Sequence, residues 1–227
     1  MSQCPLPVKR HKILLIDDHP VLRQGLSVLI NKEHDLLVGG EAENATEALE
    51  ILARETFDLA IVDVSLPGVD GIELLKELRT RHHELATLVL SMHDELVFAE
   101  RALRAGAMGF IMKQEAVENV LEAIHRVLSG QIYVSERIAT RVLRKLTEGS
   151  GQPDRRTLHM LTDREITIFT LIGQGYGTRQ IAEQLHLSVK TVESHRAHIK
   201  EKLEISTGPE LVRYASLWVG GVPQSSG

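Results

Sequence analysis

The chain has little cysteine and no long apolar run. Its 227 residues include a single cysteine, Cys4, so no disulfide can form within the chain, and a reducing compartment is consistent with this usage. No stretch approaches the roughly 18 consecutive apolar residues that a membrane helix requires, and the first residues lack the apolar core of a signal peptide. We therefore expect a cytoplasmic protein with no membrane partner. Its 43% hydrophobic content is enough to form a globular core.

Charge is unevenly distributed along the chain. Residues 1–150 hold 17 Lys or Arg against 23 Asp or Glu, whereas residues 151–227 hold 9 against 8. This split suggests two modules with different partners. Between them, residues 147–156 (TEGSGQPDRR) replace apolar periodicity with Gly, Ser, Pro and charges, which is typical of a linker.

Short apolar runs alternate with amphipathic helical segments before this linker. The runs predicted as strands are KILLID, LLVGGEA, LAIVD, TLVLSM and GFIMK, and a helical pattern follows each of them. Five such alternations predict an α/β domain with a doubly wound, five-stranded parallel sheet covered on both faces. In open sheets of this kind the ligand site lies outside the carboxyl ends of the strands.

Four of the five predicted strands end in a charged or hydroxyl-bearing side chain. The first ends in Asp17 and Asp18, the third in Asp63, the fourth in Ser91 and the fifth in Lys113. Three carboxylates at one rim repel each other unless a cation lies among them, and Mg²⁺ with oxygen ligands is the natural choice. One carboxylate could then attack phosphorus to give an aspartyl phosphate, with Lys113 and Ser91 contacting the phosphoryl oxygens.

Each of these residues also has a simpler interpretation. Asp18, which precedes His19 and Pro20, is a suitable helix cap, and Asp63 suits a turn. Ser91 could be a loop hydroxyl and Lys113 a solvated surface charge. Their joint placement at the strand ends favours a shared site over these separate roles.

Residues 11 to about 128 resemble the receiver domain of two-component response regulators, whose fold is flavodoxin-like. In that family Ser91 would occupy the Ser/Thr switch position and Phe110 the switch aromatic, although plain core packing also suits Phe110. The positions that carry the resemblance are Asp17, Asp18, Asp63 in DVSLPGVDG, Ser91, Phe110, and Lys113 in GFIMK.

The resemblance implies a phosphorylation mechanism. A sensor histidine kinase would donate its phosphoryl group to Asp63 in the presence of Mg²⁺. Asp18, Asp63 and the main-chain carbonyl of Ser65 would hold the ion, and Asp17 would act through its water shell. Movement of the switch residues would then alter surfaces that partners recognise.

The second module carries the pattern of a helix-turn-helix. Thr162 and Glu165 form a capping-box sequence ahead of an apolar-periodic helix. A short helix (TRQIAEQL), the turn HLS and a third helix that Ser188 can cap follow. In the third helix, Val192, Ile199 and Leu203 repeat at helical spacing and are expected to pack inward, leaving a polar face. A solvated amphipathic helix is the alternative that periodicity alone leaves open.

This segment resembles the LuxR-type helix-turn-helix of NarL/FixJ response regulators, in the pattern LTxRE, IA, LxLSxxTV, H, I and KL. Gln180 stands where the family usually has Glu, which could remove one internal hydrogen bond. His195 is expected to pack or to contact the DNA backbone. The side chains expected to contact DNA, with Glu193 as a candidate for base contact, are Lys190, Thr191, Glu193, Ser194, Arg196, His198 and Lys200.

The combined prediction is a transcription regulator. It consists of a receiver domain over 11–130, a linker with a helix (132–146) over 131–157, and an all-α DNA-binding domain over 158–221. Phosphorylation is expected to favour a homodimer that binds inverted-repeat half-sites in double-stranded DNA. The last helix, PELVRYASLWV, often forms the dimer contact in this family, so Trp218 lies either there or in the core.

Two other functions are compatible with part of this pattern. A phosphohydrolase that uses an aspartyl phosphate needs a second Asp two residues after the nucleophile as general acid, and Ser65 occupies that position. A regulator that has lost phosphorylation is disfavoured by the intact acidic set. We therefore expect a phosphoacceptor that is not an enzyme, apart from catalysing its own phosphorylation and dephosphorylation.

Overall fold

The computed structural model describes residues 10–66, 71–92, 95–148, 160–185 and 187–220. Cys4, residues 67–70 of the DVSLPGVDG segment, His186 in the predicted turn and most of the compositional linker lie outside these ranges. The chain divides into two compact units at residues 149–150. Among the described residues, no helix is long and apolar enough to cross a membrane.

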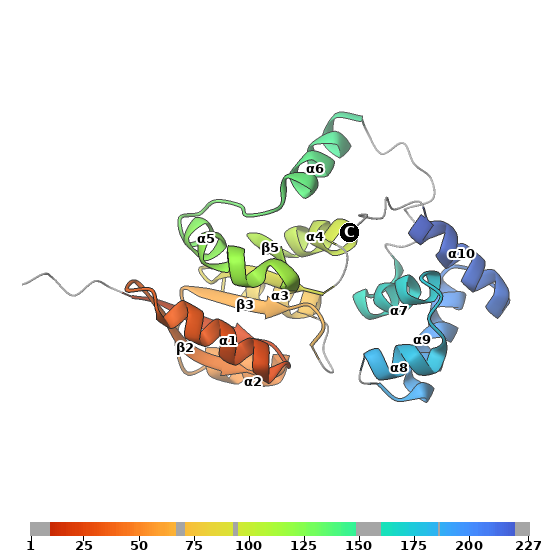
Figure 1. Ribbon diagram of the computed structural model, residues 1–227, viewed down its shortest axis with the longest axis horizontal. Coiled ribbons are helices and arrows are strands. Elements are labelled where there is room, and N and C mark those ends of the chain that lie inside the picture. Colours follow the sequence, from red (N-terminus) through yellow and green to blue (C-terminus); the bar gives the residue numbers. More distant parts are fainter. Residues whose placement is uncertain (1–9, 67–70, 93–94, 149–159, 186, 221–227) are drawn as a thin grey trace, which may run out of the picture. The chain divides into compact units, whose positions relative to one another are not determined.

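The first unit is a five-stranded parallel sheet with helices on both faces (Figure 1). The strand order is β2-β1-β3-β4-β5, so the predicted doubly wound α/β fold is confirmed. The strands are β1 (His11–Ile16), β2 (Leu36–Ala42), β3 (Leu59–Asp63), β4 (Ala86–Ser91) and β5 (Gly109–Met112). The helices are α1 (Pro20–Asn31), α2 (Ala45–Leu52), α3 (Gly71–Arg81), α4 (Glu95–Ala105) and α5 (Ala116–Leu128).

Alternate residues of the buried strands supply the two halves of the core. Ile13 and Leu15 of β1 lie in a cluster with residues of α1 and α5. The intervening Leu14 and Ile16 are equally buried, because successive side chains of a strand point to opposite faces. All five strands are parallel, so their carboxyl ends lie along one edge of the sheet.

The linker helix begins later than the sequence suggested. We expected a helix over 132–146, but α6 spans Glu136–Glu148. The preceding Tyr133 is extended, and it donates its amide to Met108 O and accepts from the Phe110 amide, both at 2.9 Å. Because β5 is the edge strand, its free backbone groups favour an added extended segment over a helix. Ser135 then caps α6, its hydroxyl accepting from the Ile138 amide at 3.2 Å.

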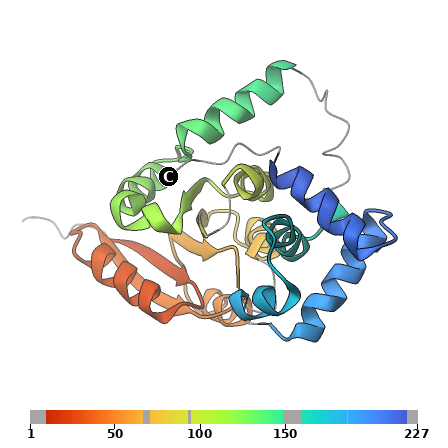
Figure 2. The ribbon, with the colours of Figure 1, turned by 45° about the vertical axis from the view of Figure 1, so that its right-hand side comes forward.

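The second unit is all helical (Figure 2, teal to dark blue). It contains α7 (Asp163–Gly173), α8 (Thr178–Gln184), α9 (Val189–Lys202) and α10 (Gly208–Gly220). The capping box of Thr162 and Glu165 is present, and Ser188 caps α9. The Gln180 amide oxygen accepts from the Gly177 amide at 2.8 Å, so Gln in place of Glu still supplies an acceptor at this helix start.

Gly71 permits the close approach of α3 to the end of β3. A Cβ atom at Gly71 would lie 2.4 Å from the Asp63 carbonyl oxygen and 2.7 Å from Val64 Cα. Both are backbone atoms, so neither can rotate away. A side chain at this position would therefore push the start of α3 away from the end of β3.

We predict that Gly71→Ala destabilises the first unit by roughly 1–3 kcal/mol, because the backbone must shift. Gly25→Ala is the matched control, since a Cβ there meets nothing within 4 Å inside α1; it should stabilise by about 0.5–1 kcal/mol. Urea unfolding followed by far-UV circular dichroism measures both changes. Fluorescence of Trp218, the only tryptophan, reports the second unit and should not change. Equal stability of the two variants would contradict this role of Gly71.

Candidate functional site

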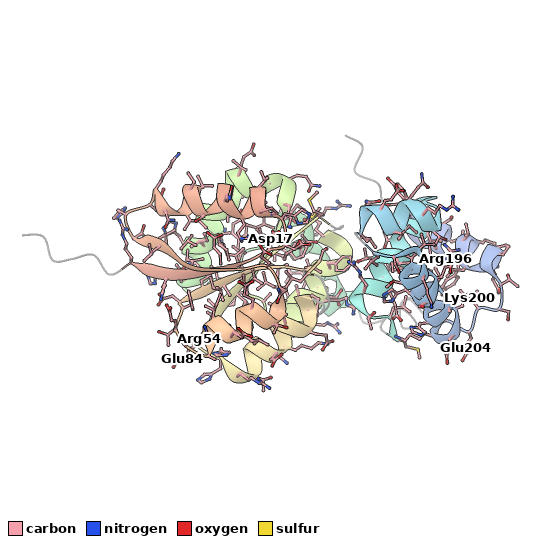
Figure 3. All side chains as sticks on the ribbon, turned by 90° about the horizontal axis from the view of Figure 1, so that it is seen from below. Asp17, Arg54, Glu84, Arg196, Lys200 and Glu204 are labelled. Atoms are coloured by element: carbon pink, nitrogen blue, oxygen red, sulfur yellow. The ribbon has the colours of Figure 1, made fainter. Side chains whose placement is uncertain are left out.

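Three carboxylates and one ammonium lie together at the carboxyl edge of the sheet. Lys113 follows β5, and its Nζ lies 2.7 Å from Asp17 Oδ2 and 2.8 Å from Asp63 Oδ2. The three side chains are at most 4% exposed. Asp18, the next residue of the β1–α1 loop, is 27% exposed. Figure 3 shows Asp17 in the interior of the first unit.

Burial sets the electrostatics of this cluster. Removal from water raises the pKa of the Asp63 carboxyl, and although the Lys113 charge opposes this effect, the Asp17 charge adds to it. Burial alone would lower the pKa of Lys113, but the charges of Asp63 and Asp17 outweigh it and raise that pKa. One ammonium therefore faces more negative charge than it can balance, and the cluster favours a further cation.

Of the two predicted switch residues, Ser91 lies on β4, the strand next to Asp63, and Phe110 lies on β5, one strand further out. Ser91 ends β4 and is fully buried, and Asp63 is in register with Leu90 beside it. Phe110 in β5 is 2% exposed, so its ring belongs to the core. The Ser65 amide donates to Asp63 Oδ1 at 3.0 Å. Coordination by the Ser65 carbonyl and movement of Ser91 and Phe110 remain predictions.

Sequence reasoning missed two residues of this rim. His19 Nδ1 lies 2.7 Å from Asp18 Oδ1 and 3.2 Å from Asp17 Oδ1. Arg23 of α1 donates to the Asp17 carbonyl oxygen at 2.6 Å and bonds Glu41 of β2 and Glu43, which follows that strand. Their place in the sequence could have indicated this role, because both residues lie at the start of the helix that directly follows the acidic pair.

The donor set suits a divalent cation. Ligand atoms of Asp17, Asp18, His19 and Asp63 all lie within 4.8 Å of one another. Carboxylate oxygens are the protein ligands that Mg²⁺ prefers, and it usually retains several waters. The half-exposed His19 and partly exposed Asp18 leave one side of the cluster open to solvent.

Two contacts join this part of the sheet to the linker. The backbone of Phe110 is bonded to Tyr133, as described above. The Ser135 hydroxyl donates to Glu95 Oε2 of α4 at 2.8 Å, and Arg137 of α6 lies 3.7 Å from Glu95 Oε1. The start of the linker is therefore joined to β5, which carries Phe110, and to α4, which follows Ser91 in the chain.

A partly buried ion pair organises the second unit. Glu165 is 3% exposed, and its Oε2 accepts from Lys202 Nζ at 2.7 Å and from the Thr162 amide at 2.8 Å. Burial alone would raise the pKa of Glu165, but these bonds outweigh it and lower that pKa. His195, which is partly buried nearby, has its pKa lowered chiefly by burial. This pair fixes α9, the predicted DNA-contacting helix, against the start of α7.

The faces of α9 follow the predicted division. Val192 and Ile199 are fully buried, which confirms the inward stripe. Arg196 and Lys200 are labelled on α9 in Figure 3. Lys190, Glu193, Ser194 and His198 are exposed, whereas Thr191, Arg196 and Lys200 are partly buried. The Thr191 hydroxyl lies 2.7 Å from that of Ser188 in the helix cap.

The raised pKa of Asp63 predicts a pH-dependent cost to stability. The folded protein holds the Asp63 proton more tightly than the unfolded chain, where the carboxyl titrates near 3.8. The stability associated with Asp63 is therefore complete below pH 3.8 and is lost as pH rises through the folded-state pKa. In EDTA at pH 7, Asp63→Asn should raise the free energy of unfolding by about 1.4 kcal/mol for each pH unit by which the pKa is raised.

Urea unfolding at pH 7 and near pH 3.5 checks this prediction, since the gain should disappear at the lower pH. Asp58→Asn is the control. Asp58 lies outside the cluster and accepts from the Lys12 amide at 2.6 Å, so its replacement should give no gain. An Asp63→Asn variant no more stable than wild type at pH 7 would show that the cluster is not short of positive charge.

Comparison with known proteins agrees with this arrangement. Residues 13–125 match the response regulator receiver domain family, and residues 159–215 match the bacterial regulatory proteins of the luxR family. The transcriptional activator protein ExaE of Pseudomonas putida is 41% identical over 203 residues, covering 89% of this chain and 94% of that protein. The oxygen regulatory protein NreC of Staphylococcus carnosus strain TM300 is 35% identical over 208 residues, covering 90% and 96%.

A solved structure of a response regulator is also similar to this chain. RcsB from Salmonella enterica serovar Typhimurium, bound to promoter rprA in the presence of the phosphomimetic BeF₃⁻, aligns with a TM-score of 0.58 and 26% identity. The alignment covers 92% of this chain and 99% of that one. The chain therefore belongs to the NarL/FixJ family of two-component response regulators, DNA-binding transcription regulators with a receiver domain and a LuxR-type helix-turn-helix.

Proposed function

We propose that Asp63 accepts a phosphoryl group from a sensor histidine kinase and that phosphorylation controls dimer formation and promoter binding. The observation that carries this proposal is the buried contact of Lys113 Nζ with both Asp63 and Asp17. It places a carboxylate nucleophile beside a cation suited to a phosphoryl oxygen. A regulator that binds promoters acts where the chromosome lies, so we place this protein in the cytoplasm.

The transfer itself requires little chemistry from the protein. An Asp63 carboxylate oxygen attacks phosphorus, an O–P bond forms, the P–N bond of the phosphohistidine breaks, and the electron pair stays with the imidazole nitrogen. Lys113 contacts a phosphoryl oxygen and Ser91 donates a hydrogen bond to another. Asp18, Asp63 and the Ser65 carbonyl would hold Mg²⁺, with Asp17 acting through its water shell. The ion, when bound, would offset the negative charge of the Asp63 carboxylate and of the phosphoryl oxygens.

The contacts of α6 support a route from the phosphorylation site to the linker. Movement of Ser91 would displace the start of α4, where Glu95 contacts Ser135 and Arg137. Movement of Phe110 would disturb the strand edge to which Tyr133 is bonded. We place the receiver at 11–130, the linker at 131–157 and the DNA-binding domain at 158–221, so this route begins at the first boundary.

The exposed face of α9 supports DNA binding through the major groove, whose width of about 12 Å admits a helix. Its net positive charge is small, so a dimer on inverted-repeat half-sites would increase affinity. Trp218 of α10 suits either the dimer contact or the core. The side chains that we propose contact DNA are Lys190, Thr191, Glu193, Ser194, Arg196, His198 and Lys200.

Phosphorylation is the first prediction of this proposal. With Mg²⁺ and acetyl phosphate, intact mass should show one phosphoryl group on wild type and none on Asp63→Ala. Only the labelled protein should elute as a dimer in size-exclusion chromatography and bind promoter DNA more tightly. Equal labelling of both proteins would assign the phosphoryl group to another residue. No labelling of wild type, even by a competent kinase, would leave a DNA-binding protein whose receiver has another role.

Variants of α9 separate phosphate contacts from base contacts. Lys190→Ala should weaken binding to all sequences and reduce the slope of log affinity against log salt by about 0.9, because one fewer counterion is released. Glu193→Gln should leave that slope unchanged and relax preference at one base position by about 1–3 kcal/mol. Fluorescence anisotropy over a salt series measures both. Identical salt slopes for Lys190→Ala and wild type would remove Lys190 from the phosphate contacts.

If the contacts between α4 and the linker transmit the change, one substitution should leave phosphorylation intact but reduce its effect on DNA binding. Glu95→Ala removes the contacts with Ser135 and Arg137, so its rate of labelling should match wild type while the gain in DNA affinity on phosphorylation falls. Arg104→Ala is the control, because Arg104 lies on the same helix and pairs with Glu100 at 2.9 Å. It should keep the full gain. A full gain in Glu95→Ala would show that α4 does not transmit the change through this contact.

A further inference from the structure

An imidazole nitrogen lies among the three carboxylates of the phosphorylation site. His19 Nδ1 is 2.7 Å from Asp18 Oδ1, 3.2 Å from Asp17 Oδ1 and 4.0 Å from Asp63 Oδ2. The ring is 51% exposed, yet this nitrogen faces the carboxylates. It also lies 3.5 Å from Lys113 Nζ. The nitrogen therefore occupies the space that the acidic residues share.

The backbone holds His19 in this position. His19 precedes α1 as its N-cap residue, with Pro20 at the first helical position. Its amide donates to Asp17 Oδ1 at 2.8 Å, and Arg23 anchors the carbonyl of the same aspartate. The β1–α1 loop is thus fixed on both sides of the acidic pair, and little movement is needed to bring the ring nitrogen to a bound ion.

The spacing of the donors suits one coordination sphere. In an octahedral site with bonds of about 2.1 Å, neighbouring donors lie about 3.0 Å apart and opposite donors about 4.2 Å apart. The distance of 4.0 Å from His19 Nδ1 to Asp63 Oδ2 lies close to the second value, and that of 2.7 Å to Asp18 Oδ1 is a little below the first. The shorter contact with Asp18 must lengthen slightly when both atoms coordinate the ion.

We propose that His19 is a direct metal ligand and gives the site a preference for borderline divalent transition ions, such as Co²⁺ or Fe²⁺, over Mg²⁺. This inference rests on the proposed function only in placing the cation at the same aspartates. Mg²⁺ prefers oxygen ligands, whereas imidazole suits borderline transition ions. A site of carboxylates alone lacks this nitrogen donor. His19 is then the residue that determines metal selectivity, and the ligating nitrogen carries no proton, which leaves the ring proton on Nε2.

Titration of the untagged, full-length protein with Co²⁺ and Mg²⁺ measures this selectivity. Loss of an outer-sphere partner already costs about 10- to 100-fold in metal affinity, so His19→Ala should weaken Co²⁺ binding by at least about tenfold. Mg²⁺ binding should change by less than about threefold. The control is His198→Ala, because Glu165, His195 and His198 form another group with metal-ligand spacing. It should leave the ratio of the two dissociation constants at the Asp63 site unchanged.

Proton NMR of the Co²⁺ form gives a direct readout of ligation. An imidazole bound to Co²⁺ shows an exchangeable, strongly hyperfine-shifted N–H resonance. This resonance should be present in wild type and in His198→Ala, and absent in His19→Ala and Asp63→Ala. Its absence from wild type, its persistence in His19→Ala, or an unchanged ratio of dissociation constants in that variant would overturn the proposal.

The same samples distinguish this inference from the proposed function. If wild type is phosphorylated at Asp63 but shows no imidazole ligation, only the role of His19 fails. If Asp63→Ala binds Co²⁺ as tightly as wild type and wild type is not labelled, the cation is not at these aspartates, and both proposals fail.

Discussion

The attraction between one buried ammonium and two buried carboxylates holds the carboxyl edge of the sheet together. Lys113, Asp17 and Asp63 come from three different strand ends, and water is almost excluded from all three side chains. In such surroundings charges interact far more strongly than in water, and an unbalanced charge is costly. Lys113 balances only part of the negative charge, so the folded site retains a tendency to bind cations. The proposed phosphorylation needs this property, because a phosphoryl group on Asp63 would add negative charge that a bound metal ion can offset.

The rest of the first unit serves to position this edge. The parallel arrangement brings the strand ends together, Gly71 lets α3 return close to the Asp63 carbonyl, and Arg23 anchors the Asp17 carbonyl. The linker is attached to the first unit at two places. Tyr133 bonds the edge of β5, and Ser135 bonds Glu95 at the start of α4. A rearrangement at the phosphorylation site would therefore act on the first residues of the linker without crossing the core.

The sequence predicted the sheet, the acidic pair, Asp63 and Lys113, because buried parallel strands are near-continuous apolar runs and the residue that ends each run is evident. It could not predict the orientation of His19, since a residue between an aspartate and a proline is equally suited to face solvent. The pairing of Tyr133 with β5 depends on which strand forms the sheet edge, which is a property of the tertiary fold. Gln180 still supplies an acceptor because an amide oxygen accepts from the Gly177 amide as a carboxylate does. The capping residues of α7 and α9 were predictable because they act over three residues.

The central claim is that the cluster of Asp63, Lys113 and Asp17 binds a phosphoryl group on Asp63. Fluorine-19 NMR with beryllofluoride and Mg²⁺ tests this most directly, because the ligand mimics a phosphoryl group on a carboxylate and its bound fluorines are resolved from free ones. The account predicts bound resonances in wild type, their loss in Asp63→Asn, and their loss or weakening in Lys113→Met. Bound resonances of equal intensity in Asp63→Asn, or none in wild type, would contradict it.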